Sequence, residues 1–274
     1  MKYLRPLLAL ALTGLFSACV AQTATPADKP AVNSAPAVAP APAVAPAPAV
    51  TPAPAPVDAS APIPKTGNAG FFQKHEKFLA RGKSGPIGVL FLGDSITEGW
   101  TKAPHIWDHY YGQYQPANFG IGGDQTQHVI WRIENGELDG ITPKVVVLML
   151  GTNNSLAHTG AQIAAADTKI VHLIREKIPG VKVLLLAIFP RGPRKSGGKD
   201  EPLEQIMAAI TAANAELAKL DDGTNVRFLD INARFLGNDR TIPKIIMPDQ
   251  LHPNAAGYQL WAEAMQSLLD EMMR

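Results

Sequence analysis

Between residues 65 and 274, short runs rich in valine, isoleucine and leucine alternate with longer stretches of helical periodicity. The runs lie at 87–92, 145–150, 181–188 and 226–231, and a shorter strand is expected just before Asn118-Phe119-Gly120. Continuous apolar runs of this length are typical of parallel strands that are covered on both faces. The alternation therefore predicts an α/β fold with a five-stranded parallel sheet.

Four stretches carry the helical pattern, at about 124–135, 161–178, 202–220 and 254–272. In the last of them, apolar residues recur every four positions from Leu260 to Met272, which places them on one helical face. Helices that connect parallel strands cover both faces of the sheet, so we expect a three-layer α/β/α sandwich. The order of the strands is left open. Ligands of such folds bind at the carboxyl ends of the strands.

The N-terminus has the composition of a secretory signal. Lys2 and Arg5 precede an apolar run, 6–16, that is too short for a permanent membrane span. The sequence Phe16-Ser17-Ala18-Cys19 resembles the bacterial lipobox, in which the cysteine is lipidated, although Phe16 stands where leucine is usual.

We therefore interpret residues 1–18 as a lipoprotein-type signal peptide and Cys19, the single cysteine, as a lipid anchor. Cleavage after Ala21 and a buried N-terminal helix are the alternatives. The first interpretation predicts an exported protein, held on a bacterial membrane and facing the periplasm or the cell surface.

Residues 19–64 are expected to be a disordered linker. They consist largely of alanine, proline and valine, and Ala-Pro-Ala-Val-Ala-Pro occurs at 35–40 and again at 41–46. Proline removes amide donors and favours polyproline II, so such a segment extends by about 3 Å per residue. It is either a tether that carries the domain away from the membrane or a spacer with no particular reach. The remaining residues, 65–274, have the size of one domain.

Charge and cysteine content exclude two classes of function. The formal net charge is +1, and no run of basic residues lies outside the extreme N-terminus, so there is no electrostatic basis for binding nucleic acid. A single cysteine excludes an intramolecular disulfide framework and a cysteine-rich zinc or iron–sulfur site.

Polar, glycine-rich loops follow the first three expected strands. They are Gly93-Asp94-Ser95, Gly120-Ile121-Gly122-Gly123-Asp124 and Gly151-Thr152-Asn153-Asn154, and Asp249 and His252 come just before the last helix. Because the carboxyl ends of parallel strands lie at one edge of the sheet, these loops are expected to meet there. A serine, two amide-bearing loops, an aspartate and a histidine are the groups that acyl transfer requires.

In this order the four blocks resemble the motifs of the SGNH (GDSL) hydrolases, and the match covers essentially all of residues 65–274. The longer stretches 118–124, 131–132, 135–138 and 189–192 are similar to the platelet-activating-factor acetylhydrolase 1b branch of that family. The resemblance implies a flavodoxin-like sandwich, ester hydrolysis by a serine, and no metal or organic cofactor. It leaves the substrate open, because the family removes acyl groups from lipids, sugars, thioesters and aryl esters.

Residue chemistry and the resemblance together give Ser95 the role of nucleophile, with the N-cap of the following helix as its structural alternative. His252 is expected to act as general base, held in the right tautomer by Asp249. Two alternatives stay open: Asp249 as a mere turn former, and Asp230 as the orienting carboxylate.

The oxyanion hole is expected to consist of the backbone amides of Ser95 and Gly123 and the side-chain amide of Asn153. Asn154 is the alternative side-chain donor, and Gly120 or Gly122 could be the residue that the turn requires. Asp94 is expected to organise its loop through hydrogen bonds to backbone amides.

Three other patterns are weaker. The loop at 120–125 departs from a dinucleotide fingerprint, because Gln125 stands in place of the third glycine. His105 and His109 are one helical turn apart but lack the glutamate of a zincin motif. A basic cluster, Arg191, Arg194, Lys195 and Lys199, is interpreted as a solvated loop in preference to an anion-binding entrance.

Taken together, the sequence predicts an exported serine esterase that removes short acyl groups, with a carbohydrate acetylesterase as the first hypothesis. The partner would be a small-molecule or polysaccharide acyl ester, and the oligomeric state is left open. The alternatives are a lysophospholipase or arylesterase of the same fold and a non-catalytic envelope-binding module.

Overall fold

A computed structural model describes residues 57–274 of the chain. The predicted signal peptide, Cys19 and residues 19–56 of the predicted linker lie outside the described residues. Within residues 57–274, every helix is too short or too polar to cross a membrane.

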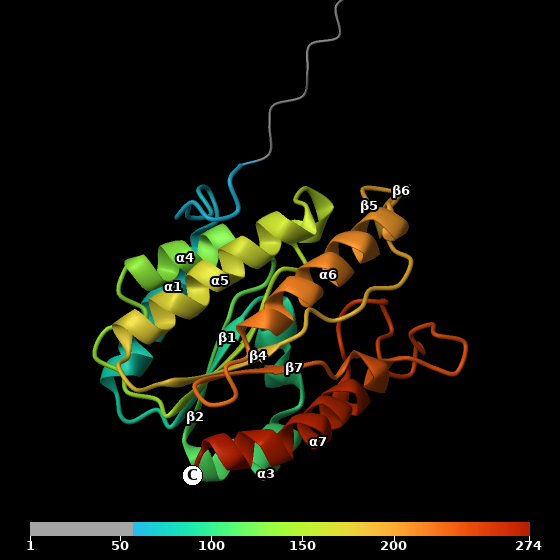
Figure 1. Ribbon diagram of the computed structural model, residues 1–274. Coiled ribbons are helices and arrows are strands. Elements are labelled where there is room, and N and C mark those ends of the chain that lie inside the picture. Colours follow the sequence, from blue (N-terminus) through green and yellow to red (C-terminus); the bar gives the residue numbers. More distant parts are fainter. Residues whose placement is uncertain (1–56) are drawn as a thin grey trace, which may run out of the picture. The chain divides into compact units, whose positions relative to one another are not determined.

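Five parallel strands form one sheet in the order β2-β1-β3-β4-β7 (Figure 1). The strands are β1 (Val89–Gly93), β2 (Pro116–Gly120), β3 (Val145–Met149), β4 (Lys182–Leu186) and β7 (Val226–Leu229). Strands β1 and β3 are buried at every position, as expected for apolar strands that are covered on both faces. The predicted five-stranded parallel sheet is confirmed. The four strands that were predicted by range begin and end within two residues of the prediction, whereas β2 includes Asn118-Phe119-Gly120, which were expected to follow the strand.

Helices cover both faces of the sheet (Figure 1). One face carries α1 (Ala69–Lys83), α4 (Thr126–Glu134), α5 (Gly160–Lys177) and α6 (Leu203–Leu217), and the other carries α3 (Pro104–Tyr111) and α7 (Ala255–Met272). Each face has its own apolar core, so the three-layer sandwich is confirmed. Helix α1 was not predicted. It begins at an Asn68 cap and buries little besides Phe71 and His75, which makes its apolar period weak.

Shorter elements complete the domain. They are α2 (Ser95–Glu98), the 3₁₀ turns η1 (Gly99–Lys102), η2 (Gly112–Tyr114), η3 (Asn154–Leu156), η4 (Ala218–Leu220) and η5 (Asn232–Phe235), and the hairpin β5 (Lys195–Ser196) and β6 (Lys199–Asp200). The hairpin was not predicted, because its strands are exposed and two residues long.

Residues 57–65, the N-terminal arm, lie against α4, α5 and the loop before α5. Four hydrogen bonds hold the arm there: His158 Nε2 to Val57 O at 2.6 Å, Thr126 Oγ1 to Ala59 O at 2.8 Å, Lys169 Nζ to Ser60 O at 3.0 Å, and Ile63 N to Gln127 O at 3.1 Å. The folded contacts therefore begin upstream of residue 65, where the sequence analysis placed the start of the domain.

Candidate active site

The carboxyl ends of β1, β2 and β3 bring three loops together. In the sheet, Gly93 lies opposite Gly120 on one side and Met149 on the other. Gly93 and Gly120 have no room for a side chain, since a Cβ on Gly93 would lie 2.2 Å from Thr97 Oγ1 and one on Gly120 would lie 2.2 Å from Glu98 N. The close packing allows the loops that follow the three strands to converge.

Ser95, His252 and Asp249 form a continuous chain of contacts. Ser95 Oγ lies 2.9 Å from His252 Nε2, and His252 Nδ1 lies 2.6 Å from Asp249 Oδ2. The other carboxylate oxygen, Asp249 Oδ1, accepts hydrogen bonds from His252 N at 2.8 Å and Leu251 N at 3.1 Å. Asp249 thus forms the local turn and also contacts the imidazole of His252.

Partial burial acts to raise the pKa of Asp249, but hydrogen bonds from His252 and Leu251 outweigh it and hold that pKa below its usual range. Asp230 makes a local turn instead, because its Oδ1 accepts from Asn232 N at 2.8 Å.

Asp94, rather than Ser95, caps α2. Asp94 Oδ1 accepts from Ile96 N at 2.8 Å, so the Ser95 hydroxyl is free to face His252. Asp94 is fully buried, and burial raises its pKa to about 7 even though the Ile96 hydrogen bond opposes this. The predicted loop-organising contact is therefore present.

Two backbone amides of these loops have no hydrogen-bond acceptor in the described part of the chain. Within residues 57–274, the amides of Ser95 and Gly123 donate no backbone or side-chain hydrogen bond. Of the three glycines in the loop after β2, Gly123 has the positive φ, at +72°. The turn therefore requires glycine at position 123.

Asn153 Nδ2 donates to Asp124 O at 2.8 Å and to Asp94 Oδ2 at 3.2 Å, so both of its protons have partners. Asn154 is buried, and its amide nitrogen lies 2.9 Å from Thr126 Oγ1. Asn154 therefore braces α4, and Asn153 is the asparagine of this loop that lies beside Asp94.

Two charged residues that the sequence analysis missed hold the loop after β2. Lys65 Nζ donates to Gly122 O at 2.7 Å and lies 2.7 Å from Asp124 Oδ1. On the opposite side, Glu98 Oε2 accepts from Gly122 N at 2.7 Å. Glu98 lies one helical turn after Ser95, a spacing that could have identified it. No sequence signal links Lys65 to the loop.

A buried ionic network lies beneath the loops. Arg132 Nε is 3.0 Å from Asp124 Oδ2, and the Arg132 guanidinium also contacts Glu137. The same guanidinium donates to Phe119 O at 3.2 Å and to Gly93 O at 3.3 Å, the carbonyls of two strand ends. The stretches 131–132 and 135–138 thus support the loop rather than enter the reaction.

The prediction of a solvated basic loop is wrong for two of its four residues. Arg194 Nη1 donates to Asp249 Oδ2 at 3.0 Å, and Arg191, which is buried, donates to Thr152 O at 3.2 Å. Both are drawn inward because carboxylates and carbonyl oxygens at the site accept from guanidinium groups. Lys195 and Lys199 are exposed on the hairpin, as predicted.

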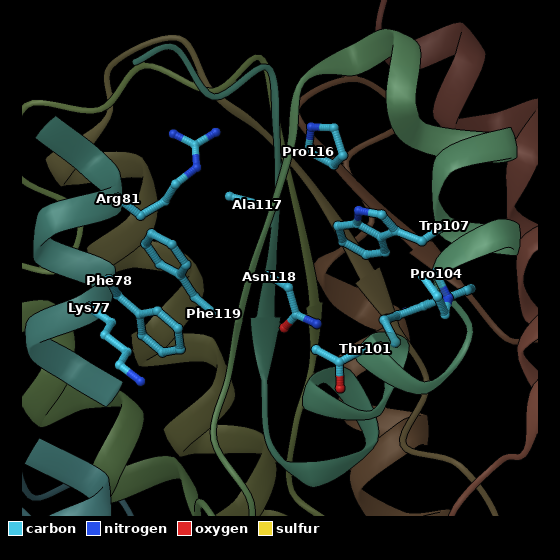
Figure 2. Close-up of a pocket in the computed structure, with 11 residues that line it drawn as sticks. Lys77, Phe78, Arg81, Thr101, Pro104, Trp107, Pro116, Ala117, Asn118 and Phe119 are labelled. Atoms are coloured by element: carbon cyan, nitrogen blue, oxygen red, sulfur yellow. The ribbon is translucent and has the colours of Figure 1, made fainter. Parts of the chain in front are cut away.

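The structure has a cleft at Ser95 and a second cavity that shares one lining residue with this cleft. A cleft of about 260 Å³ is lined by Ser95, Glu98, Gly99, Thr101, Lys102 and His252. A second cavity, of about 380 Å³, lies along β2 between α1 and α3 (Figure 2). Aromatic rings and prolines form most of its walls: Phe78, Trp100, Pro104, Trp107, Pro116 and Phe119. Two cationic side chains from α1, Lys77 and Arg81, also line it. Thr101 lines both cavities.

Two weaker patterns remain, Gln125 at the end of the loop after β2 and the pair His105 and His109. Gln125 caps α4. His105 and His109 are exposed on α3, and in the described part of the chain no group of three or more His, Cys, Asp or Glu side chains could hold a metal ion.

Residues 91–260 match the model of the GDSL-like lipase/acylhydrolase family. The chain belongs to this family. It is 36% identical to human platelet-activating factor acetylhydrolase IB subunit alpha1 over 205 residues, which cover 74% of this chain and 84% of the relative. It is 35% identical to the chicken alpha2 subunit over 208 residues, or 76% and 86% of the two chains. The resemblance stated from the motifs is therefore confirmed, and the chain is a carboxylic ester hydrolase.

Solved structures share the fold. A GDSL-like lipase from Bacteroides thetaiotaomicron aligns with a TM-score of 0.59 at 18% identity, covering 73% of this chain and 98% of that one. A carbohydrate acetylesterase family member from Sinorhizobium meliloti aligns with a TM-score of 0.52 at 18% identity, covering 68% and 98%.

Proposed function

We propose that the protein is a serine esterase with Ser95, His252 and Asp249 as its catalytic triad. The observation that carries this proposal is the pair of contacts from Ser95 Oγ to His252 Nε2 at 2.9 Å and from His252 Nδ1 to Asp249 Oδ2 at 2.6 Å. In this arrangement, Asp249 fixes the tautomer in which Nδ1 carries the proton and Nε2 is free to accept one.

The reaction then proceeds in two halves. Ser95 Oγ attacks the ester carbonyl carbon while its proton passes to His252 Nε2. Collapse of the tetrahedral intermediate breaks the bond to the leaving alcohol, which takes the proton from His252 and leaves an acyl ester on Ser95. A water molecule, deprotonated by His252, attacks this ester and releases the carboxylic acid and free Ser95.

The negative charge on the carbonyl oxygen needs donors. The amides of Ser95 and Gly123 have no competing acceptor within residues 57–274, and so both are free to bind the oxyanion. Asn153 is the third donor. We expect its longer bond, 3.2 Å to Asp94 Oδ2, to be exchanged for the oxyanion, while the 2.8 Å bond to Asp124 O keeps the side chain in place.

We propose acetyl esters as substrates, because relatives at 35–36% identity are named acetylhydrolases. A carbohydrate acetylesterase stays the first hypothesis for the alcohol portion. It rests on the predicted export and lipid anchoring at Cys19, which would place the enzyme beside envelope or environmental polysaccharide. No cofactor is required by this mechanism.

One observation favours the alternative, an esterase for lipid-like or aryl esters. The cavity along β2 has mainly apolar walls and shares Thr101 with the cleft at Ser95 (Figure 2). An apolar leaving group or acyl chain would bury surface there.

Hydrolysis of p-nitrophenyl acetate, butyrate and octanoate by the purified full-length protein, with Ser95→Ala as control, tests the proposal. We expect turnover that is highest with acetate and is lost in the variant. A preference for octanoate would favour the lipid-like substrate. Equal turnover by wild type and Ser95→Ala would overturn the triad, and no turnover by the folded protein would favour a non-catalytic binding module.

A further inference from the structure

Lys65 reaches the candidate oxyanion loop from outside the four motif blocks. It ends the N-terminal arm, and its side chain is only 12% exposed. Its ammonium donates to Gly122 O at 2.7 Å, and a Cβ built on Gly123 would lie 3.6 Å from the same nitrogen. A buried cation therefore lies beside the glycine whose amide is free.

The acceptor of this hydrogen bond belongs to the peptide group that matters for catalysis. The carbonyl of Gly122 and the N–H of Gly123 are the two ends of one planar amide. A cation on the carbonyl oxygen draws electron density toward that oxygen and makes the N–H a stronger donor, as in any polarised chain of hydrogen bonds. The effect is strongest where water is excluded, and Lys65 is largely buried.

The preceding peptide group is held by the opposite charge. Glu98 Oε2 accepts from Gly122 N at 2.7 Å, and Lys74 pairs with the same carboxylate. Gly122 is therefore fixed at both its N–H and its C=O, by a carboxylate and an ammonium. Because the Gly122 carbonyl and the Gly123 N–H belong to one planar peptide group, any rotation of the carbonyl would also rotate the N–H.

Asp124 keeps the ammonium in place without neutralising its effect on Gly122. Its Oδ1 lies 2.7 Å from Lys65 Nζ, while its Oδ2 lies 3.0 Å from Arg132 Nε. The carboxylate is thus shared between two cations. Since an ammonium has three donors, Lys65 can serve Asp124 and Gly122 at the same time.

We propose that Lys65 is a positioning residue of the oxyanion hole, which orients and polarises the Gly122–Gly123 peptide so that the Gly123 N–H binds the developing negative charge. This inference rests on the proposed serine-esterase function. It also makes the N-terminal arm part of the catalytic unit, because the arm's bonds to α4, α5 and the loop before α5 carry Lys65 to its place.

Lys65→Met removes the charge and keeps the length of the side chain, and Lys65→Arg keeps a charge. Lys177→Met is the matched control, because Lys177 Nζ pairs with Asp139 Oδ1 at 2.9 Å and contacts neither the arm nor the oxyanion loop. With full-length protein and p-nitrophenyl acetate, we expect Lys65→Met to lower kcat by about tenfold or more and to change KM by less than about twofold. Lys65→Arg should recover part of the loss, and Lys177→Met should keep the wild-type kcat.

A second readout separates this role from a general loss of structure. Sulfur accepts hydrogen bonds more weakly than oxygen, so p-nitrophenyl thionoacetate depends less on the oxyanion donors than the oxygen ester does. Lys65→Met should therefore reduce the ratio of oxygen-ester to thiono-ester kcat/KM, whereas unfolding would lower both rates equally.

An unchanged ratio, or a wild-type kcat in Lys65→Met, would overturn the inference while the esterase assignment stood. If the wild-type protein showed no serine-dependent hydrolysis, the proposed function would fail and the inference with it.

Discussion

Arg194 Nη1 and His252 Nδ1 approach the same oxygen of Asp249, Oδ2, at 3.0 Å and 2.6 Å. The Asp249 carboxylate is therefore shared between the imidazole and a permanent cation from the loop that follows β4. The two backbone hydrogen bonds to Asp249 Oδ1 hold the carboxylate even without the guanidinium. Arg194 therefore acts on the site mainly through its charge.

This predicts that Arg194→Met raises kcat by up to about fivefold, because the removed cation opposes the imidazolium that forms in the transition state. The expected rise in kcat is small because Asp249 is 46% exposed, and such ion pairs are worth about 1 kcal/mol at most. Steady-state kinetics with p-nitrophenyl acetate measure this change in kcat. Lys195→Met, on the exposed hairpin, is the control. A fall of tenfold would mean that Arg194 is needed to hold the carboxylate.

Asp94 should make the protein less stable as the pH rises. Its folded pKa of about 7 lies above the unfolded value of about 3.9, so the folded state binds the extra proton between these values. Asp94→Asn keeps an acceptor for Ile96 N and does not ionise. The free energy of unfolding of the variant relative to wild type should rise between pH 4 and pH 7, by up to a few kcal/mol. Urea unfolding at pH 4.5 and 7.5 measures this, and a constant difference would contradict the shift.

Asp249 should affect the pH dependence of stability in the opposite direction to Asp94. Its pKa is lowered in the folded state, so its ionised form stabilises the protein above the unfolded value of about 3.9, and this contribution is lost as the pH falls below that value. The stability difference between wild type and Asp249→Asn should be constant from pH 5 to 8 and shrink below about pH 4. Thermal unfolding across this range tests it. The same variant should lose on the order of 10³-fold or more in kcat.

Gly120→Ala and Gly123→Ala should fail in different ways. A Cβ at Gly120 would collide with backbone atoms of Glu98 and Asp94 at 2.2–2.8 Å, so we expect a loss of several kcal/mol in stability. At Gly123 the nearest atom is Lys65 Nζ at 3.6 Å, and only the positive φ is strained, at about 1–2 kcal/mol. Gly123→Ala should therefore fold and lose mainly kcat. Equal melting temperatures for the two variants would refute this distinction.

Ser95→Ala should leave the melting temperature within about 1 °C of wild type while kcat falls by at least about 10³-fold. The reason is that Asp94 supplies the cap of α2, so the Ser95 hydroxyl contributes no capping bond. A loss of about 1 kcal/mol, typical of a removed N-cap, would show that the hydroxyl has a structural role instead.

The sequence predicted the elements whose signal is local. Buried parallel strands such as 145–149 are continuous apolar runs, and Ser95, Asn153 and His252 follow or precede elements that periodicity can detect. What it missed depends on packing between distant segments. Lys65, Glu98 and Arg194 are ordinary surface-type residues by composition, and they reach the site only because the N-terminal arm, α2 and the β4 loop fold toward the strand ends. The sequence could not distinguish Asn153 from Asn154 as the side-chain donor, because the two neighbours differ only in the direction that the folded loop gives their side chains.

The proposed nucleophile and base are 157 residues apart in the chain, and the base comes just before the final helix. During synthesis, Ser95 is therefore made long before His252, and every intermediate length of chain has a serine without its proton acceptor. A cut of the chain between Ser95 and His252 also leaves the serine without its proton acceptor if the two fragments separate. Esterase activity of this protein should consequently report on completion of the whole domain, appearing in one step when α7 docks.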